Sequence, residues 1–90
     1  MTLNDLLIRA VRSGGYSEAK DLLLRGASPN TRDSELNDTV FGVAWLFDYS
    51  MICALLLEHG AKSNFDKDVE AAILEYGRLR RDFEEIRRSY

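Results

Sequence analysis

The feature that most restricts the fold of this chain is a short stretch that is written twice. Residues 22–30 read LLLRGASPN, and residues 55–64 read LLLEHGAKSN. When the two stretches are aligned on Gly26 and Gly60, they lie 34 residues apart. Self-similarity at a period of roughly 20 to 50 residues is typical of stacked repeats. In such repeats one helical unit cannot bury its own apolar face, so a second copy covers it.

Apolar residues at helical spacing predict two pairs of helices around these stretches. Thr39 is placed to cap the second pair, and Asp68 is placed to cap a last helical segment. Each pair ends at a glycine that can take the left-handed conformation, and a polar, extended link follows. The predicted segments are Leu3–Val11 and Tyr16–Gly26 in the first pair, and 40–47 and 51–60 in the second.

These residues carry a family resemblance. The stretch TVFGVAWLFDYSMICALLLEHG at 39–60 aligns without a gap with T-P-L-H-L-A-A-x-x-G-H-x-x-I-V-x-L-L-L-x-x-G, the pattern of ankyrin repeats. The residues that match outright are Thr39, Ala44, Ile52, Leu55, Leu56, Leu57 and Gly60. The first unit resembles the helix pair of an N-terminal ankyrin repeat, so the resemblance covers about residues 1–67.

The resemblance implies an all-α fold, a short stack of helix-turn-helix units with extended fingers and a C-terminal capping or projecting helix. In this division the single domain 1–90 consists of an N-terminal capping repeat at 1–30, a central repeat at 31–64 and a C-terminal helical cap at 65–90.

Four departures from the family pattern carry structural expectations. Val40 replaces the usual proline and Gly42 the usual histidine, so the hydrogen bonding that tightens this turn should be lost. One additional residue precedes Thr39, and we expect the finger around Leu36 to be irregular. Trp45 replaces a small residue, which should push the neighbouring helices apart or turn the ring outward.

The C-terminal segment fits two alternatives. If Asp68 is aligned with Thr39, Gly77 falls in a helix–helix turn, and residues 78–90 would pack back on Leu55–Leu57 as a third, capping repeat. The other alternative is one continuous helix with a single apolar seam, available for oligomerisation through Leu79, Phe83, Ile86 and Tyr90. That seam has heptad spacing through Val69, Ala72, Tyr76, Leu79, Phe83, Ile86 and Tyr90.

Composition excludes several classes of function. The net charge is −3, which argues against direct nucleic-acid binding even though the last residues are rich in arginine. Cys53 is the single cysteine and cannot form an internal disulfide, so we expect a cytoplasmic protein. No apolar run is long enough to span a membrane. His59 and Cys53 are too few for a zinc site and are not placed to form a nucleophile–base pair, so we expect no enzyme, metal or cofactor.

What remains is a surface for another protein. In ankyrin repeats the concave binding face is formed by the finger tips and the ends of the first helices, and here Arg12 and Ser13 occupy the first-helix end of the first unit. The cluster at 45–49 is aromatic with an acidic neighbour, a composition that resembles an interface centre and rim. The alternative is that Leu46 and Phe47 pack on the finger or on the C-terminal helix. The predicted partner-binding residues are Ser34, Glu35, Asp38, Trp45, Leu46, Phe47 and Tyr49.

The expected function is therefore a non-enzymatic protein–protein interaction module, a small stand-alone inhibitor or masking protein that uses a concave acidic and aromatic face. One alternative is a phage anti-defence or bacterial immunity-type protein that blocks a nucleic-acid-binding cleft with its carboxylates. Another is a homo-oligomer, such as a homodimer, assembled through the C-terminal heptad helix.

Overall fold

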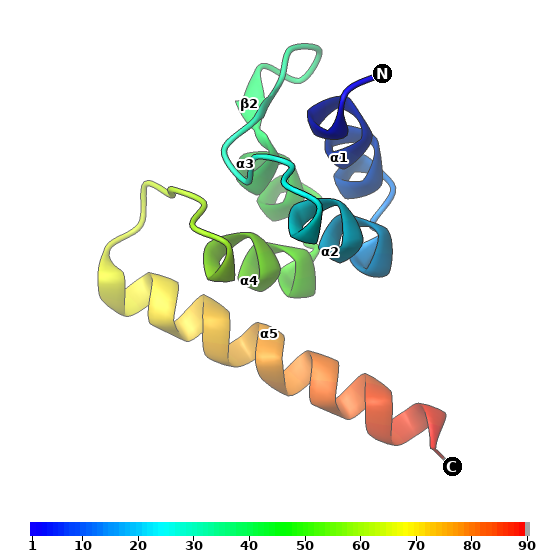
Figure 1. Ribbon diagram of the computed structural model, residues 1–90. Coiled ribbons are helices and arrows are strands. Elements are labelled where there is room, and N and C mark those ends of the chain that lie inside the picture. Colours follow the sequence, from blue (N-terminus) through cyan, green and yellow to red (C-terminus); the bar gives the residue numbers. More distant parts are fainter. Residues whose placement is uncertain (90) are drawn as a thin grey trace.

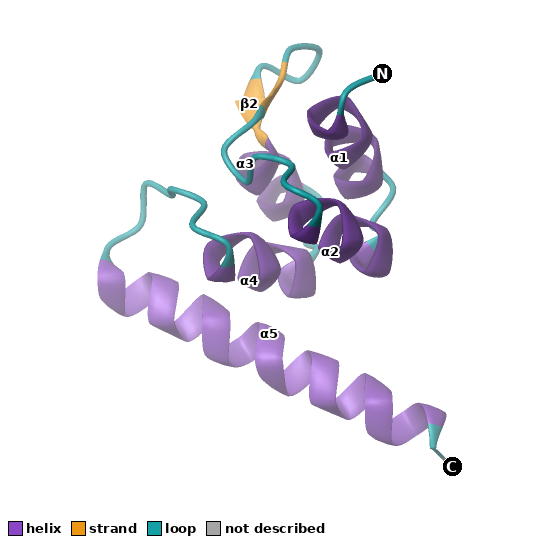
Figure 2. Ribbon diagram, in the orientation of Figure 1, coloured by secondary structure: helices purple, strands orange, loops and turns teal. Residues whose placement is uncertain are grey.

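A computed structural model describes residues 1–89, and within that range the chain is helical apart from short links and one two-stranded sheet (Figures 1 and 2). The expectation of a mainly helical chain is confirmed. The elements are α1 (Leu3–Arg12), α2 (Tyr16–Leu24), β1 (Arg32–Asp33), β2 (Asp38–Thr39), α3 (Val40–Leu46), α4 (Ser50–Glu58) and α5 (Lys67–Arg88).

The first four helices form two pairs whose backbone hydrogen bonds repeat at an interval of 34 residues. Gly26 and Gly60 both have positive φ, 110° and 94°, and each ends its pair with the left-handed residue that helix stops favour. The sequence repeat is therefore also a repeat of backbone geometry. In the helix–helix turns, Gly15 N donates to Ala10 O and Tyr49 N donates to Ala44 O, both at 2.9 Å. After the glycines, Ala27 N donates to Leu22 O at 3.0 Å and Ala61 N donates to Leu56 O at 2.9 Å.

The core lies where the two helix pairs meet, and each helix supplies small or branched side chains to it. The sequence places these residues three or four apart, so one face of each helix is apolar. The largest side chains that are fully buried there are Leu7, Val11, Val40, Val43, Ile52 and Leu56.

The link between α2 and α3 forms the first finger, a hairpin whose tip extends past the helices in Figure 1. Its two short strands are antiparallel, with Arg32 opposite Thr39 and Asp33 opposite Asp38. The two strands of the finger are only two residues long each. This irregular finger is what the additional residue before Thr39 led us to expect. Asn37, in the turn, has a positive φ of 55°.

The start of α3 places the Asp38 side chain beside Gly42. Thr39 caps the helix as expected, because its Oγ1 accepts a hydrogen bond of 3.1 Å from Gly42 N. A Cβ at position 42 would lie 2.3 Å from the carboxyl group of Asp38. The Asp38 side chain therefore fills the space that a larger residue at 42 would need.

The C-terminal segment is one continuous helix, so the helical hairpin with a turn at Gly77 is wrong. α5 runs along α4 and extends past it (Figure 1). Gly77 allows this close packing, since a Cβ there would lie only 2.2 Å from the Cβ of Ala54. The helix is capped by Asp66, whose Oδ1 accepts from Val69 N at 3.0 Å, and not by Asp68.

Candidate interaction site

Trp45 lies at the centre of the predicted binding cluster, and its ring points outward. Trp45 is 51% exposed, so its ring lies outside the helix interface, which is one of the two outcomes that the sequence predicted. It is nevertheless held in place by two phenylalanines. The ring centroids of Trp45 and Phe65 are 4.8 Å apart, and those of Trp45 and Phe41 are 6.5 Å apart. Aromatic neighbours at these distances restrict the ring, so the indole presents a defined surface.

One side of the Trp45 ring borders a groove between the two polar links, which we call the finger groove. Its volume is about 430 Å³. Of the predicted binding residues, Asp38, Trp45 and Leu46 line it. Arg32 and Lys62 line it as well, so the groove carries both signs of charge, whereas the sequence predicted an acidic and aromatic face.

The two links that border the finger groove are joined by Asn30. Its Oδ1 accepts a hydrogen bond of 2.8 Å from Lys62 N, and its Nδ2 donates to the Gly60 carbonyl at 3.3 Å. One asparagine thus fixes the first link against the second. The groove is therefore bounded by two segments that are tied to each other.

A second, more apolar groove lies on the other side of Trp45, between α4 and α5, and we call it the helix groove. Its volume is about 390 Å³. Trp45 is the wall that the two grooves share. The other residues that line the helix groove are Asp48, Ser50, Cys53, Val69, Ala72, Ile73 and Tyr76.

Three of the remaining predicted residues, Glu35, Phe47 and Tyr49, lie near the C-terminal end of α1. Arg12 forms an ion pair of 3.1 Å with Glu35 from the finger, and the Tyr49 hydroxyl donates to the Arg12 carbonyl at 3.4 Å. Phe47 packs on Tyr49, with ring centroids 5.9 Å apart. Ser34 is exposed at the finger tip and lines neither groove. The predicted residues are thus divided into three that line the finger groove, three near the end of α1 and one at the finger tip.

The finger is anchored by a carboxylate that the sequence analysis did not single out. Asp33 is 1% exposed and is bound by both Nε and Nη2 of Arg12. It also accepts the backbone N–H groups of Glu35 at 3.0 Å and Leu36 at 3.2 Å. The Arg12 guanidinium, more than these backbone bonds, keeps the pKa of Asp33 below its usual value, although burial acts in the opposite direction.

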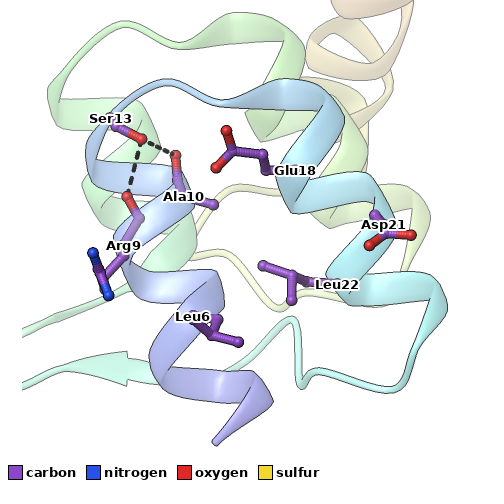
Figure 3. A pocket seen from close by; sticks show the side chains of 7 residues that line it. All are labelled: Leu6, Arg9, Ala10, Ser13, Glu18, Asp21 and Leu22. Carbon is purple, nitrogen blue, oxygen red and sulfur yellow. Dashed lines mark hydrogen bonds between the residues drawn. The ribbon is translucent and has the colours of Figure 1, made fainter. Parts of the chain in front are cut away.

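A third groove, of about 470 Å³, lies between α1 and α2 (Figure 3). The Ser13 hydroxyl donates to the carbonyl oxygens of Arg9 and Ala10, both at 3.1 Å, and so it satisfies the end of α1 instead of facing a ligand. The walls contain no aromatic side chain, and none of the predicted binding residues is among them. They are formed by Leu6, Arg9, Ala10, Ser13, Glu18, Asp21 and Leu22.

Cys53, the one nucleophilic thiol of the sequence, is buried in α4. Burial raises the pKa of this thiol to about 12, and the negative charge of Asp48 adds to the shift. The thiol is therefore protonated at neutral pH and behaves as a small apolar side chain. Over residues 1–89, no group of three or more His, Cys, Asp or Glu side chains is arranged to hold a metal ion.

Comparison with known proteins gives no match: no family model, no curated protein and no solved structure is significantly similar to this chain. None of the helices in the described part of the chain combines the length and apolar character needed to cross a membrane.

Sequence reasoning missed two parts of this surface. Phe65, which packs on Trp45, is a lone aromatic residue in a polar link, and its isolation was the only signal available. The helix groove was missed because Val69 and Tyr76 were assigned to the apolar seam of the last helix alone. Only the packing of α5 on α4 brings these two residues beside Trp45.

Proposed function

We propose that this chain is an ankyrin-like module that binds another protein without catalysis and masks the surface that it covers. The observation that carries the proposal is the apolar end of α3, where Trp45, Leu46 and Phe47 are all exposed. Leu46 is the most exposed of the three, at 68%. Exposed aromatic and large aliphatic side chains that adjoin grooves are typical of protein-binding sites.

The ankyrin-like part of the proposal is supported by the repeat of backbone geometry. Both helix pairs have the same turn, the same glycine stop and an extended link after it, at the spacing of 34 residues. In ankyrin repeats the ends of the first helices contribute to the binding face, and in this chain that position holds the exposed residues at 45–47.

The lining of the finger groove indicates what kind of partner would fit. Trp45 and Leu46 offer an apolar contact, while Asp38 lies on one side and Lys62 on the other. A partner that complements this groove inserts an apolar side chain and has charged groups of both signs around it. We expect its binding to depend mainly on apolar burial and to tolerate moderate salt, because rim charges contribute little.

The test compares two leucines of equal exposure. Leu46 is 68% exposed and Leu24, on α2, is 69% exposed. Tagged wild-type protein and the Leu46→Asp and Leu24→Asp variants are each used to capture proteins from the cells that encode the chain, and captured proteins are quantified by mass spectrometry. We expect a partner that is retained by wild type and by Leu24→Asp and is lost with Leu46→Asp. Equal capture by all three proteins would place the site elsewhere.

Masking is tested on the partner that this comparison identifies. Stoichiometric addition of the wild-type chain should abolish one activity or one interaction of that partner, and Leu46→Asp should leave it intact. Binding that leaves every measured property of the partner unchanged would reject masking while retaining the interaction.

A further inference from the structure

The C-terminal part of the apolar seam of α5, from Leu79 to Ile86, is not covered by its own domain, whereas Val69, Ala72 and Tyr76 line the helix groove. The residues that contact α4 most closely are Ile73 and Gly77, which are buried on an adjacent side of the helix. The seam residues Leu79, Phe83 and Ile86 are between 56% and 58% exposed. Tyr90, the last residue of the predicted seam, lies outside the described residues. A row of large apolar side chains on one helix face is typical of a coiled-coil contact surface.

The charges beside the seam are sorted by sign. In heptad notation Tyr76 and Phe83 are a positions, and Leu79 and Ile86 are d positions. The flanking g positions are then acidic, Glu75 and Asp82, and the flanking e positions are basic, Arg80 and Arg87. These four flanking residues are all exposed.

This arrangement distinguishes the two ways in which a second helix can lie on the seam. In a parallel pair each g residue faces the e residue five positions later in the other helix, so Glu75 meets Arg80 and Asp82 meets Arg87. In an antiparallel pair g faces g and e faces e, which brings like charges together. The seam of this helix thus complements a second copy of itself, in one orientation.

We propose that two copies of this chain associate in parallel through the exposed seams of their α5 helices, from Tyr76 to Ile86. The contact buries Tyr76, Leu79, Phe83 and Ile86 against their equivalents, and ion pairs between g and e positions fix the orientation.

The packing within one chain is compatible with this contact. Because α4 lies against the side of α5 that includes Gly77, the domain does not cover the seam between Leu79 and Ile86. The ion pairs that occupy the flanking charges within one chain are loose, with 3.7 Å between Arg78 and Glu75 and 3.7 Å between Arg87 and Glu84. Exposed pairs of this kind contribute little, so they do not prevent exchange for pairs between copies.

A helix that is already folded also reduces the cost of association. Most helical stability in proteins comes from packing and not from propensity, and short coiled coils must order both strands when they assemble. Here the first half of α5 is held by α4 through Ile73 and Gly77. The seam is therefore preorganised before a second copy arrives.

Parallel association places both domains at the same end of the paired helices. The two finger grooves then belong to one particle and face partners from the same end of it. This arrangement permits two-point attachment to a partner that has two copies of the recognised surface, with a gain in avidity set by geometry.

The orientation is tested with single cysteines in the full chain. Ile86→Cys places a thiol in the seam, and Glu85→Cys places one on the exposed side next to it. In the parallel pair the two thiols at position 86 meet, and a disulfide requires Cα atoms only about 4.4–6.8 Å apart. We expect oxidation to give a covalent dimer with Ile86→Cys and none with Glu85→Cys. Wild type is the background control, since Cys53 is buried.

If light scattering shows a dimer but the Ile86→Cys variant does not cross-link on oxidation, the parallel orientation is wrong. In an antiparallel pair, position 86 faces the other end of the seam. A chain that remains a monomer across a tenfold range of concentration, or that forms a species other than a dimer, would overturn the proposal as a whole.

Variants with reversed flanking charges test whether the seam binds a second copy of this chain. The variant with Arg80→Glu and Arg87→Glu has only acidic flanks, and the variant with Glu75→Arg and Asp82→Arg has only basic flanks. We expect each variant alone to be a folded monomer and the mixture to form a heterodimer. Circular dichroism confirms that helix content is retained. Unchanged dimerisation of either variant alone would show that the flanking charges do not select the partner.

These results are independent of the proposed masking function. Leu46→Asp should leave the dimer intact, and Phe83→Asp should abolish the dimer while retaining attachment to a foreign partner at a single finger groove. If Phe83→Asp instead abolished capture of a foreign protein and wild type were a monomer, the seam would be the site of that protein and not of a second copy.

Discussion

Asp33 is a buried carboxylate that joins the first finger to the end of α1. Two nitrogens of Arg12 bind it, and it accepts two backbone N–H groups from the turn of the finger. No regular strand continues past Asp33, so its side chain and not a neighbouring strand accepts these N–H groups. A single side chain therefore fixes the conformation of a loop that borders the candidate site.

The first prediction concerns the pH dependence that Asp33 confers. Its folded-state pKa is lowered from 3.8, chiefly by Arg12, so the ionised form is stabilised by folding. The corresponding stability is present above the unfolded pKa, near pH 4, and is lost as the pH falls through the folded pKa. We expect Asp33→Asn to lower the free energy of unfolding by about 1 to 3 kcal/mol at pH 7 and to flatten its pH dependence below pH 4.

The measurement is urea unfolding at a series of pH values, and Asp21→Asn serves as the control. Asp21 forms an exposed ion pair of 3.0 Å with Arg25, so its loss should change stability by less than about 0.5 kcal/mol. An acid dependence that is identical in wild type and Asp33→Asn would show that other carboxylates account for it.

At the scale of elements, Gly77 determines how closely α5 can lie on α4. Glycine in the middle of a helix lowers helix stability by about 1 kcal/mol relative to alanine. A side chain at this position, however, would place its Cβ 2.2 Å from Ala54 Cβ and 3.2 Å from the Ser50 carbonyl oxygen. Neither contacting atom is the far end of a flexible side chain, so the helices would have to separate.

We therefore predict that Gly77→Ala destabilises the protein by about 1 to 2 kcal/mol, because overpacking outweighs the gain in helix propensity. The measurement is the free energy of unfolding in urea. Ala54→Gly opens space at the contact, so Gly77→Ala should lower the free energy of unfolding by a smaller amount in that background. In a double-mutant cycle the coupling energy should therefore be opposite in sign to the destabilisation caused by each single substitution. If Gly77→Ala stabilised the chain, propensity would dominate and the close contact would not limit the packing.

The helices that could be predicted from the sequence are those whose signals lie close to them along the chain. Heptad-like spacing, the Thr39 cap and the two glycine stops lie within a few residues of the elements that they define, and the structure has these elements where the sequence predicts them. α5 was different. Gly77 suits both a turn and a close helix contact, and the choice depends on Ala54, which is distant in sequence.

At the scale of the whole molecule, the candidate site was predictable only in part, because grooves are made by elements that meet in three dimensions. Trp45 and Leu46 could be singled out from composition, and both line the finger groove. Glu35 is predicted to face a partner, and the structure shows in addition that it forms an exposed ion pair with Arg12. No local pattern indicates that an arginine in α1 reaches a finger that begins some twenty residues later.

The last prediction tests whether α5 completes the fold of the two helix pairs. α4 is strongly apolar, and Ile52, Cys53, Ala54, Leu55 and Leu56 are all buried in it. α5 covers one side of this helix, with Gly77 on Ala54 and Ile73 near Cys53.

A chain ending at residue 65 would expose that side to water and retain a core too small for a stable domain of its size. A chain ending at residue 81 would keep both contacts. We expect the shorter chain to aggregate or to lose its cooperative thermal transition, and the longer one to unfold cooperatively as a monomer, because it lacks Phe83 and Ile86. Calorimetry and light scattering measure both properties. A cooperative transition in the chain ending at residue 65 would show that the two helix pairs fold without α5, which would leave the long helix free to serve association alone.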